Sequence, residues 1–171
     1  MCGAELSQLP DGVQRVVSFL QEAGYTSTPR MLQDAARTAQ QAADALGVEL
    51  GQIAKSIIFK RKSDGVAVLV ITSGDKRVDE AKVQALVCDG SSKLGRADAD
   101  FVKRRTGFSI GGVAPVAHLS DSVTLLDKSL FRFETVWAAA GHPNAVFEVK
   151  SEILQLLVQA PVADVTADTV L

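Results

Sequence analysis

Apolar residues recur along the chain at two different spacings, which predict a mixture of helices and strands. Apolar positions three or four residues apart predict helices at 11–23, 38–47, 79–87, 98–105 and 151–158. Alternating or continuous β-branched runs predict strands at 51–60, 66–71, 122–126, 135–139 and 145–149. Because helices and strands follow one another without a strict βαβ rhythm, we expect an α+β fold with a mixed, mostly antiparallel sheet surrounded by helices.

The chain organisation indicates a single domain over residues 1–171. This length suffices for one well-packed core, and no fixed repeat or linker rich in Pro, Gly or Ser divides it. The strands at 51–60 and 66–71 flank the turn sequence Lys62-Ser-Asp-Gly65, so they should pair as a hairpin. The final dozen residues carry a weaker pattern, and we expect them to form a tail.

Lys55 interrupts the apolar strand predicted at 51–60. Side chains alternate along a strand, so Lys55 shares a face with Ile53 and Ile57. An unpaired buried ammonium is unfavourable, and two arrangements avoid it: the stem lies along the apolar surface with its head in water, or an anionic or carbonyl group meets the amine. Ser56 would lie on the opposite face, and a direct role for it would require a twist or bulge.

The segment Thr106–Pro115 places two adjacent glycines and a proline within five residues. Gly111 and Gly112 can adopt positive φ, and Pro115 fixes the exit of the segment. The loop can therefore present the backbone N–H groups of Gly111, Gly112, Val113 and Ala114 to a small polar ligand. For this pattern alone, an ordinary tight turn between strands is the alternative.

Several segments together resemble the YbaK family, and the resemblance extends to about Val149. They are Thr38–Gly47, Gly51–Lys60, Ser73–Asp75, Ala97–Asp98, Thr106–Pro115 and Gly141–Phe147. The family comprises freestanding relatives of the editing domain inserted in bacterial prolyl-tRNA synthetases, and its characterised members hydrolyse the ester of mischarged aminoacyl-tRNA. The resemblance implies that Lys55 is the essential lysine of the family and that Gly111–Pro115 is its substrate-binding Gly-x-x-x-Pro loop.

An aminoacyl ester needs positioning and stabilisation of charge more than it needs a strong protein nucleophile. In this interpretation Lys55 contacts the terminal phosphate or the ester carbonyl, the loop amides hold the aminoacyl group, and water attacks. Candidates for further substrate contacts are Ser56, Gly141, His142 and Asn144; exposed side chains of a Pro-fixed turn are the alternative for the last two. The segment 141–144 differs from the glycine-rich, basic pattern of cysteine-specific members, which leaves alanine, serine, threonine or a small non-protein amino acid open.

Composition and charge limit the classes of partner and cofactor that we expect. A formal net charge of −2 argues against a protein that coats nucleic acid, and we expect no DNA partner. Basic residues cluster at 60–62, 76–77 and 103–105. Each cluster has two possible roles, a solvated face or a contact to an RNA phosphate. Two cysteines, Cys2 and Cys88, and two histidines predict neither a disulfide framework nor a metal site, and no cofactor is expected. Without an apolar run of about 18 residues, we expect no membrane partner and a cytoplasmic location.

We therefore expect a metal-independent hydrolase that deacylates mischarged aminoacyl-tRNA, on tRNA(Pro) or a related tRNA carrying a small wrong amino acid. The acceptor end of aminoacyl-tRNA would be its substrate, and a prolyl-tRNA synthetase is a further expected partner. One alternative is a non-catalytic module that binds tRNA or the aminoacyl group alongside a synthetase, and another is a general small-ester hydrolase. The sequence lacks the Gly-x-Ser-x-Gly elbow, the Walker loop and the Rossmann glycine pattern of other common enzyme classes.

Overall fold

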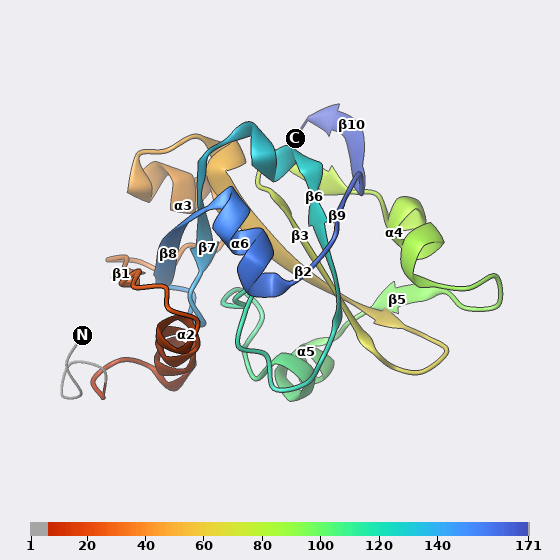
Figure 1. Ribbon diagram of the computed structural model, residues 1–171, viewed down its shortest axis with the longest axis horizontal. Coiled ribbons are helices and arrows are strands. Elements are labelled where there is room, and N and C mark those ends of the chain that lie inside the picture. The colour runs from red at the N-terminus through yellow and green to blue at the C-terminus, as the bar shows by residue number, and fades with distance from the viewer. Residues whose placement is uncertain (1–6, 171) are drawn as a thin grey trace.

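An eight-stranded mixed sheet organises the fold in the computed structural model, which describes residues 7–170 (Figure 1). The strands are β1 (Arg30–Met31), β2 (Ile53–Arg61), β3 (Ala67–Ser73), β5 (Leu94–Arg96), β6 (Val123–Asp127), β7 (Thr135–Ala139), β8 (Ala145–Lys150) and β9 (Val162–Ala163). They run in the order β1-β8-β7-β2-β3-β6-β9, with β5 also paired to β2. The α+β class with a mixed sheet and a single domain is confirmed.

Five α-helices surround this sheet in the described part of the chain, close to their predicted positions. They are α2 (Asp11–Glu22), α3 (Ala39–Leu46), α4 (Glu80–Val87), α5 (Ala99–Thr106) and α6 (Ser151–Val158). The side chains of Thr38, Asp79 and Asp98 each accept a hydrogen bond from a backbone N–H in the first turn of α3, α4 and α5, respectively. These caps explain where the three helices begin, because they satisfy amides that have no partner within the helix.

The two faces of the sheet bury different clusters of side chains. Ala54 on β2 belongs to the main core, which α2 and α6 cover. On the opposite face, Ile53 packs with α3, whereas Phe59 packs in a separate cluster with Val83 of α4. Figure 1 shows α3 and α4 far apart along this face of the sheet. Lys55 lies on β2 between these two apolar clusters.

The predicted hairpin of β2 and β3 is confirmed, with a regular register from Ala54↔Ser73 to Lys60↔Ala67. On its other edge, β2 pairs with β7 only at residues 53 and 54 and with β5 only from residue 59 onward. Residues 55–58 therefore lie in a gap between β7 and β5. This gap places the backbone around Lys55 at an opening of the sheet.

The final dozen residues form two strands, so the prediction of a tail is wrong. β9 pairs in parallel with β6, and β10 (Thr166–Val170) pairs antiparallel with β4 (Lys76–Val78) in a second, two-stranded sheet. The segment between them buries Val165 completely. A short strand followed by one apolar residue is too weak a pattern to identify without knowledge of its partner strands.

The N-terminus of α2 packs against the turn that follows β7 through two glycines. Gly141 has a φ of 92°, and a Cβ atom added to it would overlap the carbonyl oxygen of Gly12. A Cβ atom on Gly12 would in turn overlap the carbonyl oxygen of Gly141. Only glycine therefore allows this contact between α2 and the turn.

We predict that Gly141→Ala destabilises the fold more than Gly24→Ala does. Gly24 also has a positive φ, of 77°, but its added Cβ would meet no atom within 4 Å. The two substitutions share the conformational penalty, and only Gly141→Ala adds overpacking, which should lower the free energy of unfolding by about 1–3 kcal/mol more. Urea unfolding of both variants measures the difference. Equal stabilities would show that the helix and the turn separate freely.

Candidate functional site

A cavity of about 260 Å³ opens at the gap between β2 and β7. It is lined by Lys55, Ser56, Gly111, Val113 and His142 among the predicted site residues. Ala36, Arg37, Thr38, Ala39, Ala42, Ile53, Ala54, Ile57, Trp137, Ala138, Ala139, Pro143, Ala145 and Val146 complete the lining. We call it the Lys55 cavity. The strand, the glycine-rich loop and the turn after β7 therefore converge on one hollow.

The Lys55 amine has a carbonyl partner. Its Nζ atom donates a hydrogen bond of 2.7 Å to the backbone carbonyl oxygen of Lys76 on β4. Burial lowers the pKa of the Lys55 ammonium below its usual value, and the negative charge of Asp75 partly offsets this effect. The sequence allowed either a solvated amine or a carbonyl-paired one, and the structure shows the second.

Asp75 is itself fixed by a bidentate pair with Arg132. The guanidinium donates hydrogen bonds of 2.9 and 2.6 Å to the two carboxylate oxygens. These bonds hold the pKa of Asp75 below its usual range. The result is a fixed negative charge that favours the ammonium form of Lys55. Sequence reasoning gave neither residue a role, because Arg132 lies 57 positions from Asp75 and nothing in the pattern relates them.

The glycine-rich loop is anchored from below by side chains that the sequence did not single out. Arg15 of α2 donates to the carbonyl oxygens of Thr106 and Ala117, at 2.6 and 2.8 Å, and its guanidinium stacks 4.2 Å from the centroid of the Phe108 ring. The imidazole of His118 contacts the carbonyl oxygen of Ala114 at 2.6 Å. These bonds secure both ends of the loop, and Gly111 lies at the cavity.

Ser56 lies on the opposite face of β2 from Lys55, because the pairing with β3 contains no bulge. It nevertheless lines the Lys55 cavity, since the gap beside β7 exposes both faces of the strand there. Its Oγ atom is buried and has no hydrogen-bond partner. A buried hydroxyl without a partner is unfavourable, so a ligand in the cavity would gain a ready donor or acceptor.

The remaining predicted loop residues do not line the Lys55 cavity. A Cβ atom on Gly112 would lie 2.9 Å from the backbone of His142, so Gly112 allows the loop and the turn to touch. Ala114 and Pro115 are buried beneath the loop. The positive φ that the sequence suggested for two glycines occurs only at Gly111, at 94°.

The turn after β7 contributes His142 and Pro143 to the cavity, but not the predicted residues Gly141 and Asn144. Gly141 packs against α2, as described above. The Asn144 side chain donates a 3.3 Å hydrogen bond to the carbonyl oxygen of Leu32, which ties the turn to the segment before α3. His142 Nδ1 accepts the backbone N–H of Asn144 at 3.1 Å. The imidazole is thereby held at the mouth of the cavity.

Three lining residues from outside the predicted set add a cation, a hydroxyl and an aromatic ring to the site. Arg37 brings an exposed cation to the rim, and Thr38 at the start of α3 brings a hydroxyl. Trp137 is half-buried and forms part of the wall. Long-range pairing of β7 with β2 places Trp137 beside Ile53, and no local pattern indicates that contact.

A second hollow of about 510 Å³ continues from Lys55 along the same face of β2. Ile57, Ile58 and Phe59 form its floor, and Arg77, Val78, Glu80, Arg96 and Ala97 line its sides. We call it the Arg77 groove. Arg77 and Arg96 are exposed, and none of the ion pairs in the described residues involves either of them. Both guanidinium groups are therefore available to an anionic ligand.

The described residues hold little that suggests other chemistry. No three His, Cys, Asp or Glu side chains between residues 7 and 170 gather as metal ligands would. Cys88 is a half-buried free thiol, and Cys2 lies outside the described residues. No helix in residues 7–170 has the length and apolarity needed to cross a membrane.

Comparisons with known proteins agree with the geometry. The family model of the aminoacyl-tRNA editing domain matches residues 33–156. The uncharacterized protein YwhH of Bacillus subtilis is 37% identical over 112 residues, which are 66% of this chain and 69% of that protein. The proline–tRNA ligase of Limosilactobacillus fermentum is 32% identical over 98 residues, or 56% of this chain, and the match spans 17% of the ligase.

A solved structure supports the same assignment over nearly the whole chain. It is described as a "putative trans-editing enzyme for prolyl tRNA synthetase" and superposes with a TM-score of 0.86 at 37% identity, covering 94% of this chain and 99% of the other. Fold and sequence thus agree. The chain belongs to the aminoacyl-tRNA editing domain family, whose activity is the deacylation of aminoacyl-tRNA.

Proposed function

We propose that the protein acts in trans on mischarged tRNA(Pro), or a closely related tRNA, and hydrolyses the ester of a small wrong amino acid. The observation that carries the proposal is the convergence of Lys55, Ser56 and the glycine-rich loop on one small cavity. The likeness to the trans-editing structure and to proline–tRNA ligases supports the choice of tRNA.

The ester is activated by its vicinal ribose hydroxyl, so the site needs to orient it and to stabilise negative charge on the carbonyl oxygen. In the proposed complex the Lys55 ammonium contacts the ester carbonyl or the terminal phosphate. Its positive charge stabilises the negative charge there. Backbone N–H groups at Gly111 and Val113 hold the aminoacyl group, and the free Ser56 hydroxyl completes its hydrogen bonds. Water attacks the ester, and no metal is required by this scheme.

The shape of the Lys55 cavity favours a small side chain. Its volume of about 260 Å³ lies below the 300–1,000 Å³ that is typical of ligand pockets. Much of the wall is alanine, including Ala36, Ala39 and Ala138, with Trp137 as the one large aromatic in the lining. A wall of this kind admits alanine, serine or threonine more readily than a bulky residue.

The Arg77 groove gives the RNA a path away from the cavity. It begins at Lys55 and Ile57, which line both hollows. An apolar floor suits the face of a nucleobase or ribose, and the two free guanidinium groups suit phosphates. We therefore propose that the nucleotides next to the aminoacylated ribose occupy the groove.

A panel of aminoacyl-tRNA substrates tests the proposal. Alanyl-, seryl- and threonyl-tRNA(Pro) should lose their ester at substoichiometric protein, whereas prolyl-tRNA(Pro) should survive because its ring joins the side chain to the amine and so presents a different shape from an open side chain. Acid-gel or thin-layer assays of the remaining ester measure this. Stoichiometric binding with release of intact ester would instead indicate a non-catalytic module, and equal cleavage of simple aminoacyl esters would indicate a general esterase.

Lys55→Ala should lower the deacylation rate by about 10²- to 10³-fold, because a preorganised positive charge is lost. Lys55→Arg should also be impaired, since a planar fork does not fit a site built for a point charge. Lys150→Ala is the matched control, because this lysine is mostly exposed at the end of β8. Single-turnover rates and thermal unfolding of each variant separate catalysis from folding. Deacylation by Lys55→Ala at the wild-type rate would remove the proposed role.

Arg77→Ala and Arg96→Ala should each raise KM for aminoacyl-tRNA by about tenfold, the effect of one lost charged hydrogen bond. The slope of log KM against log salt should fall by about 0.7 for each, as expected for one contact to a single strand. Cleavage of an aminoacyl-adenosine, which is too short to fill the groove, should not change. Arg30→Ala, on β1 at the far edge of the sheet, is the control. Unchanged KM in both groove variants would place the RNA elsewhere.

A further inference from the structure

The strand that supplies the carbonyl partner of Lys55 is short; the Asp75–Arg132 pair holds the residue before it, and the C-terminal segment holds the strand itself. β4 comprises only Lys76–Val78 and lies outside the eight-stranded sheet. Its strand partner in the described chain is β10, with the register Thr166↔Val78 and Val170↔Lys76. The Lys76 residue that accepts the Lys55 amine is thus directly paired with the C-terminal strand.

The C-terminal segment is attached to the domain by the carboxyl group of Asp127, at the end of β6. Asp127 is fully buried. Its Oδ1 atom accepts the backbone N–H of Val165 at 2.9 Å. Its Oδ2 atom accepts the backbone N–H of Ser129 at 3.0 Å and a short hydrogen bond from the Ser129 hydroxyl. One buried carboxyl group therefore joins β6, the turn after it and the entry to β10.

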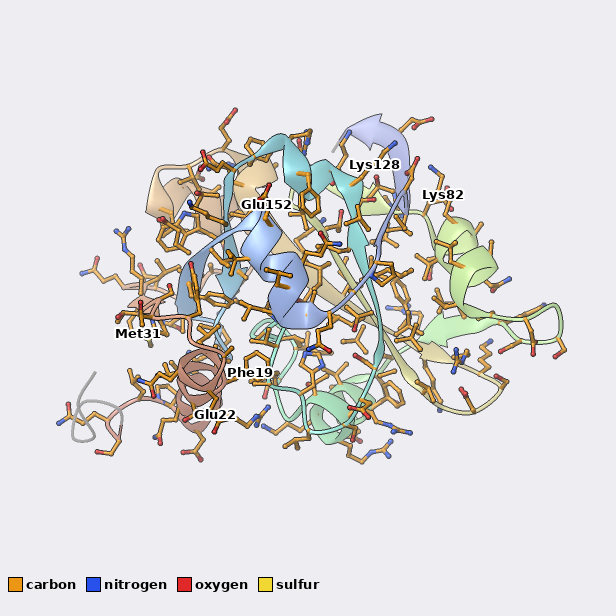
Figure 2. All side chains as sticks on the ribbon, viewed as in Figure 1. Phe19, Glu22, Met31, Lys82, Lys128 and Glu152 are labelled. Atoms are coloured by element: carbon orange, nitrogen blue, oxygen red, sulfur yellow. The ribbon has the colours of Figure 1, made fainter. Side chains whose placement is uncertain are left out.

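Ties from α4 strengthen this attachment. The backbone N–H of Asp79 donates to the carbonyl oxygen of Val165 at 2.8 Å. Lys82 donates to the carbonyl oxygen of Thr166 at 2.7 Å and forms an ion pair with Asp164 at 3.3 Å. Lys128 also pairs with Asp164, at 3.2 Å. Figure 2 shows Lys82 and Lys128 beside the C-terminal segment, on α4 and after β6. Of these two lysines, only Lys82 contacts the backbone of β10.

We infer that the segment 162–170, secured by Asp127 and Lys82, is the element that positions Lys55, because it holds β4 and with it the Lys76 carbonyl. The inference rests on the function proposed above for Lys55. The segment lies beyond residues 33–156, the part of the chain that the editing-domain model matches. Asp127 and Lys82 would then be positioning residues, since neither lines the Lys55 cavity.

The physical argument concerns the freedom of the lysine side chain. A lysine stem has four rotatable carbons, so holding it in one rotamer loses side-chain entropy. The hydrogen bond from Lys55 to the Lys76 carbonyl offsets this loss of entropy only while β4 stays in place. If β4 withdraws, the amine can turn toward water, and the positive charge no longer lies at the ester.

The test compares Asp127→Asn and Lys82→Met with two matched controls in the full-length protein. Lys128→Met removes the other lysine that pairs with Asp164 but leaves the β10 backbone contact intact. Val17→Ala trims a buried side chain of α2 in the main core, on the other face of the sheet from the cluster of Val78, and so reproduces a loss of stability alone. All four variants are assayed below their unfolding temperatures.

We expect Asp127→Asn and Lys82→Met to lower kcat by about tenfold or more, because misplaced catalytic groups slow chemistry. KM for aminoacyl-tRNA should rise as well, since β4 also carries Arg77 of the groove. Cleavage of an aminoacyl-adenosine, which does not reach the groove, should therefore fall by the same factor and reports the change at Lys55 alone. The Lys55 13Cε NMR signal, identified by its absence from Lys55→Ala, should move toward the signals of exposed lysines. Neither control should change kcat or this signal.

Each outcome decides the inference. An unmoved Lys55 signal and an unchanged kcat in both variants would overturn it. If Asp127→Asn fails to fold, Lys82→Met decides alone, because its side chain is partly exposed and keeps its methylene stem. If the wild-type protein deacylates nothing, the proposed function fails, and the NMR signal still shows whether the C-terminal segment positions Lys55.

Discussion

A half-buried ammonium on an apolar strand face is the constraint on which the site depends. Lys55 lies between two separate hydrophobic clusters, one under α3 and one under α4. A charge that is removed from water is tolerated only where a polar partner replaces the lost water. The Lys76 carbonyl provides the partner, and the fixed charge of Asp75 favours the protonated form. Lys55 therefore depends on the second, small sheet of β4 and β10, because β4 carries the carbonyl that accepts its hydrogen bond.

The interrupted edge of β2 turns this lysine into a site. A strand paired along both edges would bury the backbone around residues 55–58 and separate the two faces. Pairing with β7 ends at residue 54 and pairing with β5 begins at residue 59, so side chains from both faces reach one hollow. Ser56 and Lys55 line the same cavity for this reason, although they alternate along the strand. The glycine-rich loop then closes the hollow from the side of the main core.

Local patterns were sufficient to predict the helices, the β2–β3 hairpin and the face of Lys55, because each depends on neighbours within a few residues. They were insufficient wherever a partner is distant in sequence. Arg15 supports a loop about 90 to 100 residues away, and Gly12 needs Gly141 to explain it. The strand β10 was missed for the same reason, since its only strand partner in the described chain, β4, is itself three residues long. The loop glycines were predicted as a pair, yet only Gly111 lines the cavity, because the turn at His142 takes the space beside Gly112.

The elements that we propose to select the amino acid and those that hold the lysine are different. The cavity wall comes from α3, β7 and the glycine-rich loop, whereas the Lys55 amine is held by β4, Asp75 and the C-terminal segment. Substitutions in the wall, for example at Ala138 of β7, can change the volume of the hollow and leave the hydrogen bond from Lys55 to Lys76 in place, because different residues form the two. A domain built in this way can retain one hydrolytic arrangement while its preference for the amino acid side chain changes.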